Sequence, residues 1–334
     1  MSTRWAILGA VVVVIVVIIA VIAITTPKTP EEEKVVTNEE RLASIPTTAV
    51  KMTPSNDSFK PVTHSPLWGQ PVPMPGPVNT AGSEDSPFFT PNGTWFFFFF
   101  TPDMNIPVQQ QLVDGFTGLW WTRLVNGTWT APEKIILNDE DSLEGAECVV
   151  GTTMWFASVR AGNIGEIDVY SAEYIDGKWT DVENLGEQLN SEYDIGEFHL
   201  MGDMSTLYFH SGVIGAGETM DLWVSHKSGE SWSTPTPLTD LNTVTKAEGY
   251  PYLTPDGKEL WFTGNHSGLE GTGPSIYRSV KQANGSWGAP EEIISNFAGE
   301  CTLDEEGNIY FVHHYFNPSD SVIYEADIYV AYKL

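Results

Sequence analysis

The apolar pattern divides the chain into an N-terminal hydrophobic run, a polar stretch and a long region of short apolar strands. The run, Trp5–Ile24, holds twenty uncharged, almost wholly apolar residues, and as a helix it would span about 30 Å, the thickness of a bilayer's hydrocarbon core. It predicts an uncleaved transmembrane anchor in residues 1–25, because it exceeds the apolar core of an ordinary signal peptide. Arg4 precedes the run and Glu31 follows it, so we expect a single-pass cell-membrane protein with its C-terminal domain outside the cytoplasm.

The polar stretch, residues 26–65, is rich in Pro, Thr, Lys and Glu and contains few aromatic residues. Such a composition buries too little apolar area to offset the entropy lost on ordering. We therefore expect a flexible, disordered stalk that spaces the following domain, residues 66–334, from the membrane.

From residue 66 onward one unit recurs, and each copy is marked by a tryptophan. The tryptophans lie 50 to 61 residues apart, at Trp68, Trp129, Trp179, Trp232 and Trp287. In four units a dipeptide that suits a tight hairpin turn precedes the tryptophan, at Asn126-Gly127, Asp176-Gly177, Ser228-Gly229 and Asn284-Gly285. A period near 50 residues is typical of propeller blades.

Two further strands recur in the unit. One is a continuous apolar run, such as Trp95–Phe100, which predicts a strand buried on both faces. The other carries an Asp-x-aromatic pattern, as at Asp168–Tyr170, and with an inner strand and the Trp strand it makes four strands per unit. The last unit lacks a Trp strand, whereas a spare one at Leu67–Pro71 precedes the first. We therefore predict an all-β fold, a five-bladed β-propeller of four-stranded blades that the N-terminal strand closes.

The run Glu248–Gly257 (EGYPYLTPDG), followed by Leu260–Phe262, resembles the repeat of the TolB-like propeller family, also called the WD-repeat-like family. The resemblance covers roughly residues 66–334, although Trp179 lacks the proline that follows the other tryptophans and Ser275 replaces the strand aspartate. It implies that residues just before each innermost strand converge at the mouth of the central channel. It does not imply a function, because such propellers serve many roles.

Composition narrows the range of partners. Forty-four acidic residues against sixteen basic ones give a formal net charge of −28, so we expect no nucleic-acid partner, since binding one needs a basic surface. Only Cys148 and Cys301 are cysteines, which excludes a disulfide-dense scaffold, and we favour two thiols over one disulfide.

Alignment of the repeats brings acidic residues together at the predicted channel mouth. Glu147, Glu197 and Glu300 take one position, which Ser86 and Tyr250 take in the other blades. Close to them we expect Glu84, Asp85, His199 and Glu248. Crowded carboxylates have raised pKa values and favour a cation, a hydroxyl-rich ligand or a basic group. The alternative is that these acids bond backbone amides where the blades begin.

The function predicted from these features is that of an extracytoplasmic, membrane-anchored binding module, with a glycan, a peptide or a partner protein at the channel mouth. No nucleophile–base pair indicates an enzyme, and no metal-ligand motif indicates a cofactor, although calcium is a candidate for the carboxylates. A glycoside hydrolase using Glu147, Glu197 and Glu300 is the first alternative. A structural component of the cell envelope is the second.

Overall fold

The computed structural model describes residues 35–137, 142–190, 195–212, 220–265 and 273–334. The predicted membrane span, Trp5–Ile24, lies outside these residues. Within the described ranges no helix is both long and apolar enough to cross a bilayer.

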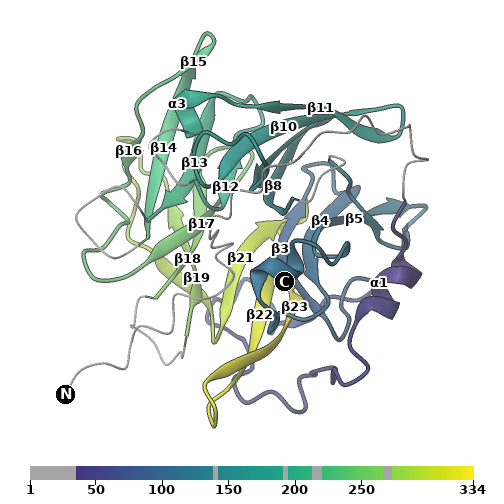
Figure 1. Ribbon diagram of the computed structural model, residues 1–334. Coiled ribbons are helices and arrows are strands. Elements are labelled where there is room, and N and C mark those ends of the chain that lie inside the picture. The colour runs from purple at the N-terminus through teal and green to yellow at the C-terminus, as the bar shows by residue number, and fades with distance from the viewer. Residues whose placement is uncertain (1–34, 138–141, 191–194, 213–219, 266–272) are drawn as a thin grey trace, which may run out of the picture.

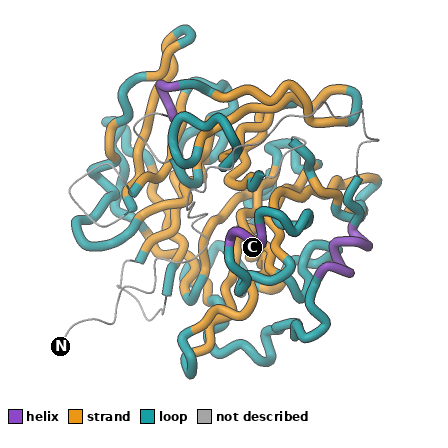
Figure 2. Tube along the Cα trace, viewed as in Figure 1, coloured by secondary structure: helices purple, strands orange, loops and turns teal. Residues whose placement is uncertain are grey.

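Five antiparallel sheets follow one another along the chain and form the five blades of a propeller (Figures 1 and 2). The first blade consists of β3 (Ser83–Phe89), β4 (Trp95–Thr101), β5 (Gly118–Val125) and β6 (Thr128–Trp129), with β7 (Glu133–Lys134) also pairing β5. The second consists of β8 (Glu144–Val150), β9 (Thr153–Ser158), β10 (Asp168–Ile175) and β11 (Lys178–Asn184). The third consists of β12 (Phe198–Leu200), β13 (Thr206–Ser211), β14 (Asp221–Ser228) and β15 (Ser231–Trp232), with β16 (Thr236–Pro237) beside β14.

The last two blades contain strands from the N-terminal part of the chain. The fourth consists of β17 (Glu248–Leu253), β18 (Glu259–Gly264), β19 (Ser275–Val280) and β20 (Glu291–Ser295), with β1 (Val62–Thr63) added at its outer edge. The fifth consists of β21 (Ala298–Leu303), β22 (Ile309–Asn317), β23 (Val322–Ala331) and, outermost, β2 (Val72–Pro73). The prediction of five four-stranded blades is confirmed, with short additional strands on three of them.

The core lies between the blades, which explains the continuous apolar strands. Phe96 to Phe100 on β4 are each at most 3% exposed, because alternate side chains face the blades on either side. Trp95 contacts Trp121 of its own blade and Tyr174 of the second blade, with ring centroids 5.2 and 4.9 Å away. Aromatic pairs at these distances add to the free energy gained from buried area.

The ring closes as predicted, by a strand that precedes the first blade. In β2, Val72 pairs with Val330 of β23, and Trp68 forms an isolated bridge with Lys333. The Trp68 indole N–H donates to the carbonyl of Gly307 (2.8 Å), so the tryptophan fastens the closing segment to the fifth blade. Closure pairs an edge that would otherwise be open to another chain.

The prediction of a flexible stalk for residues 26–65 is wrong for the part that the structure describes, residues 35–65. Helix α1 (Asn38–Ser44) begins with a capping box of Thr37 and Glu40 and lies beside the first blade (Figure 1). Its Arg41 is fully buried and forms an ion pair with Glu84 (2.8 Å). Further along, Lys51 pairs with two acidic residues of β23, and β1 extends the fourth blade. The charged residues of this segment therefore neutralise buried acids of the propeller.

The expectation about the cysteines agrees with the structure. Cys148 on β8 and Cys301 on β21 are both buried and free. Burial raises the pKa of the Cys148 thiol to about 12, so this thiol is un-ionised at neutral pH.

Candidate functional site

The innermost strands of the five blades, β3, β8, β12, β17 and β21, surround the axis and contact one another. Four of them contain a bulge at the same place, where the pairing register shifts. The residues at this place have left-handed backbones, with φ of 46° at Ser86, 55° at Ala146 and Tyr250, and 52° at Glu300. Such a φ costs a non-glycine residue about 1–2 kcal/mol. Bulges of this kind re-aim side chains beside functional sites.

The bulges also change the predicted alignment by one residue in the second blade. Ala146, and not Glu147, occupies the position of Ser86, Tyr250 and Glu300, because Gly145 is the last paired residue before the shift in β8. Glu147 follows one residue later and still lines the same hollow as Glu197 and Glu300. In the first blade Asp85 stands where the other bulged strands have glycine, which adds a fourth carboxylate to the group.

We call these four acidic residues, Asp85, Glu147, Glu197 and Glu300, the axial carboxylates. Ser86 links two of them: its hydroxyl donates to Glu300 Oε2 (3.2 Å) and Glu197 Oε1 (3.3 Å), and its N–H donates to Glu300 Oε2 (3.1 Å). The Ser86 hydroxyl therefore bridges Glu300 and Glu197, which belong to different blades.

The axial carboxylates share an unfavourable electrostatic environment. Asp85, Glu147 and Glu300 are 2%, 5% and 7% exposed, and Glu197 is partly exposed. Burial raises the pKa of Glu147 to about 8 and that of Glu300 to about 7. Burial and then the neighbouring acids raise the pKa values of Asp85 and Glu197 as well. Because no Lys or Arg of the described ranges offsets this effect, part of the group is protonated at neutral pH.

Several atoms of this group have no hydrogen-bond partner. Both carboxylate oxygens of Glu147 and the Oδ1 of Asp85 are buried without one. Both ring nitrogens of His314, which is 1% exposed, are likewise unpaired. Unpaired buried polar atoms are rare in folded proteins. Where they do occur, a ligand that supplies the missing partner is one explanation.

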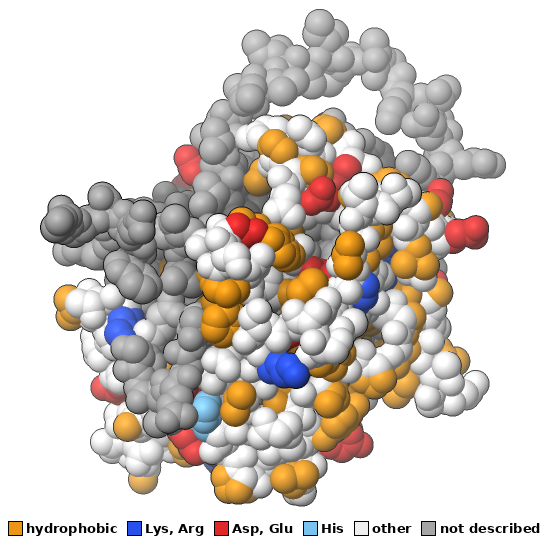
Figure 3. All heavy atoms as spheres, turned by 90° about the horizontal axis from the view of Figure 1, so that it is seen from below, with side chains coloured by type: hydrophobic (Ala, Val, Ile, Leu, Met, Phe, Trp, Pro, Cys, Tyr) orange, Lys and Arg blue, Asp and Glu red, His pale blue; other side chains and the backbone are white. Residues whose placement is uncertain are grey.

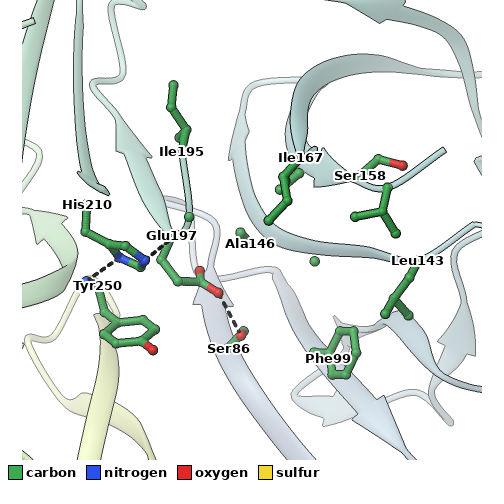
Figure 4. Close-up of a pocket in the computed structure, with 14 residues that line it drawn as sticks. Ser86, Phe99, Leu143, Ala146, Ser158, Ile167, Ile195, Glu197, His210 and Tyr250 are labelled. Atoms are coloured by element: carbon green, nitrogen blue, oxygen red, sulfur yellow. Dashed lines mark hydrogen bonds between the residues drawn. The ribbon is translucent and has the colours of Figure 1, made fainter. Parts of the chain in front are cut away.

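His210 on β13 organises the backbone around Glu197 (Figure 4). The Tyr250 N–H points at its Nδ1 (3.1 Å) and the Glu197 N–H at its Nε2 (3.4 Å). Burial lowers the pKa of His210 to about 3, so the ring is neutral and only one of its nitrogens accepts. Gly196 makes room for this ring, since a Cβ there would lie 2.0 Å from His210 Nε2.

Three hollows meet at the axial carboxylates. The first, of about 570 Å³ including space open to solvent, has an apolar wall that includes Phe99, Leu143, Ile167 and Ile195, and Glu197 lies between this wall and His210 and Tyr250 (Figure 4). The second, of about 370 Å³, is lined by Glu147, Glu197 and Glu300. The third, of about 500 Å³, lies beside Glu300 and His314. Tyr250 lines all three hollows and thus marks their junction.

The structure separates the predicted site residues into two groups. His199 joins the axial group: it lines the second hollow and contacts the ring of Tyr252, with centroids 4.8 Å apart. Glu84 and Glu248 line none of the three hollows. Glu84 pairs with Arg41, and Glu248 accepts from the N–H and hydroxyl of Thr243, both at 2.9 Å.

Sequence reasoning did not select His210, His314 or Tyr250 as site residues. The signal for His210 is a histidine at the end of an otherwise apolar strand, after Leu207-Tyr208-Phe209. The repeat alignment places Tyr250 with the glutamates, but a tyrosine adds no carboxylate to the predicted acidic group. His314 carries no comparable signal, since its unpaired ring nitrogens become apparent only in three dimensions.

No three His, Cys, Asp or Glu side chains among the described residues are placed to hold one metal ion. On the face seen in Figure 3, basic side chains of the described residues stand singly among apolar and acidic ones. Calcium binding and the lack of a nucleic-acid partner both remain predictions.

The fold defines the class: the chain is a five-bladed β-propeller. No family model and no curated protein matches it. Among solved structures it is similar to TolB from Acinetobacter baumannii, at 14% identity and a TM-score of 0.44, over 76% of this chain and 55% of that one. The chain thus spans about half the length of that TolB.

Two glycosidases are also among the similar structures. One is a thermostable family-43 glycoside hydrolase, at 12% identity and a TM-score of 0.46, over 80% of this chain and 91% of that one. The other is an α-L-arabinofuranosidase from Podospora anserina in complex with cellotriose, at 12% identity and a TM-score of 0.44, over 83% and 97% of the two chains. At these values no functional argument rests on the likeness.

Proposed function

We propose that this protein is a binding module whose ligand enters at the junction of the three hollows and contacts the axial carboxylates. The observation that carries the proposal is Glu147, whose two carboxylate oxygens lack partners although the residue is only 5% exposed. Burying an unpaired carboxylate costs several kcal/mol. A ligand that supplies the missing hydrogen bonds or charge explains why the residue is retained.

The pKa shifts do not single out an acid and a base among the axial carboxylates. A glycoside hydrolase needs one carboxylic acid and one ionised carboxylate on either side of the scissile bond, so their environments push the two pKa values apart. Here the pKa values of all four axial carboxylates are shifted upward, and burial is the largest cause for each. A hydrolase remains the second candidate, because Glu147, Glu197 and Glu300 come from three blades and line one hollow.

We further propose that the Trp5–Ile24 helix anchors the propeller to the cell membrane and places it outside the cytoplasm. The ordered segment that follows, residues 35–65, packs on the first, fourth and fifth blades. An anchor joined to such a segment would hold the propeller in a restricted orientation relative to the bilayer.

The test uses the full chain in detergent micelles on glycan and peptide arrays, with and without calcium. The test variant is the triple substitution E147Q/E197Q/E300Q. Its matched control is E183Q/E187Q/E230Q, which changes three exposed glutamates in the same way and gives the same net charge. We expect a ligand class that the wild type and the control bind and that the test variant binds at least ten-fold more weakly.

The absence of any ligand class that depends on the axial carboxylates would overturn the proposal and leave a structural role in the cell envelope. Release of reducing sugar from a bound glycan would replace it with the hydrolase. If binding needs calcium and is lost in the test variant, the axial carboxylates would hold the ion.

A further inference from the structure

We propose that the group bound at the axial carboxylates is an alkylammonium, the end of a lysine side chain or of a free polyamine, lying along the apolar wall of the first hollow. This inference rests on the proposed function and adds the chemical class of the ligand. It follows from the charge of the site, from its unpaired atoms and from the shape of the first hollow.

The site lacks a positive charge that comparable buried acids have. Glu84 pairs with Arg41 (2.8 Å) and Glu144 with Arg160 (2.9 Å). Lys51 bridges two acids of β23. Among the described residues, none of the four axial carboxylates has a Lys or Arg partner. A cation from outside the chain would do for the axial carboxylates what Arg41, Arg160 and Lys51 do for these acids.

The unpaired atoms at the site are carboxyl oxygens, which accept hydrogen bonds when they are ionised, and the two nitrogens of a neutral imidazole, one of which accepts and one of which donates. Glu147 offers two carboxylate oxygens and Asp85 one. His314 lines the third hollow beside Glu300 and Tyr250, and burial lowers its pKa to about 3, so its neutral ring has one accepting nitrogen. An ammonium group has three donors and no acceptor. The Ser86 hydroxyl already donates to Glu197 and Glu300, so it is not a free donor for a sugar hydroxyl.

The first hollow suits an unbranched apolar stem. Phe99, Leu143, Ile167 and Ile195 form part of its wall, and the side chain of Glu197 also lines it (Figure 4). Long basic side chains cover apolar surface with their methylene groups while the charged end reaches a polar environment. The hydrogen-bond acceptors come from different blades. A lysine-type ammonium, which is compact and has rotatable donors, therefore fits them better than a planar guanidinium, which prefers a single coplanar carboxylate.

The experiment measures binding to the full chain in detergent by isothermal titration calorimetry. The probes are cadaverine, spermidine and three acetylated, amidated tripeptides, Gly-Lys-Gly, Gly-Arg-Gly and the uncharged Gly-norleucine-Gly. We expect the lysine peptide or an amine to bind the wild type and the control E183Q/E187Q/E230Q. Affinity should fall at least ten-fold in E147Q/E197Q/E300Q and in the single variant E147Q, and the norleucine peptide should not bind.

The probes also separate the two sources of the group. Tighter binding of the lysine peptide indicates a protein partner, and tighter binding of spermidine indicates a free polyamine. Equal binding to the test and control variants would overturn the inference, because it would reflect only the general acidity of the protein. A third outcome is that no amine binds but a glycan binds and depends on the axial carboxylates. This outcome would overturn the inference of an alkylammonium ligand and leave the proposed binding function standing. If no probe and no array ligand binds, both fail.

Discussion

Two sets of buried acids lie close together on the inner strands, and they differ in what surrounds them. Glu84, Glu144 and Glu248 occupy equivalent positions, and each has a basic partner or two hydrogen-bond donors. The axial carboxylates lie one to three positions further along their strands. All four have raised pKa values, and Glu147 and Asp85 also have unpaired oxygens. The first set joins turns and the N-terminal segment to the blades. The second set weakens the fold where it lies, which is typical of residues kept for function.

The largest effect should come from breaking a pair in the satisfied set. R41M removes a fully buried guanidinium that pairs with Glu84 and lies over the ring of Phe100, 4.6 Å from its centroid. The substitution leaves a buried carboxylate without its cation, and we expect a loss of about 3–5 kcal/mol in the free energy of unfolding. Urea denaturation measures it. The double variant R41M/E84Q should recover part of the loss, and a loss below about 1 kcal/mol in R41M would contradict the comparison.

The opposite sign is expected for the axial carboxylates. E147Q/E197Q/E300Q removes acidic groups that have no Lys or Arg partner among the described residues, so without ligand the free energy of unfolding at pH 8 should rise by about 1–3 kcal/mol. The control E183Q/E187Q/E230Q should stay within about 0.5 kcal/mol of the wild type, because its residues are exposed. A destabilised test variant beside an unchanged control would show that the axial carboxylates serve the fold.

The pH dependence of stability sharpens the same contrast. An acid whose pKa is higher in the folded state stabilises the protein fully below its unfolded pKa, and this contribution is lost as pH rises through the folded value. With pKa values of about 8 for Glu147 and about 7 for Glu300, the wild type should lose stability between pH 5 and pH 8. Glu197 and Tyr250 line the same hollows, Asp85 interacts electrostatically with both, and His210 stays neutral over this range.

Thermal unfolding scans at half-unit pH steps measure this effect. The slope should be smaller in E147Q/E197Q/E300Q than in the wild type. It should not vanish, because burial also raises the pKa values of Glu325 and Asp327 to about 7. Equal slopes in the two proteins would show that the axial carboxylates do not change their protonation between the folded and unfolded states.

The smallest effect concerns the strained backbone that aims the axial side chains. Ala146 has a φ of 55°, which glycine adopts without strain, so A146G should gain about 0.5 kcal/mol after the entropic cost of glycine. The substitution changes no carboxylate, and ligand affinity should stay the same. A loss of stability would mean that the buried methyl group contributes more than the strain costs.

The sequence predicted the blades well because the repeat is local. The hairpin dipeptides and apolar strands such as Trp95–Phe100 each specify their own strand, and Trp68 indicated closure because the last unit lacked a counterpart. The order of residues 35–65 could not be predicted, because Arg41 and its partner Glu84 are far apart in the sequence. Glu147 was misaligned by one residue because a bulge leaves no mark in the apolar pattern.

The closing strand also constrains how the chain folds during synthesis. The partner of β2 is β23, which belongs to the fifth and last blade. The segment of β2 therefore stays unpaired until this blade has left the ribosome. Until then the four earlier blades form an open arc with two exposed apolar faces, and such surfaces make a nascent chain prone to aggregate. Because a contact between distant parts of the chain is entropically costly, ring closure should be the slow and cooperative step of folding.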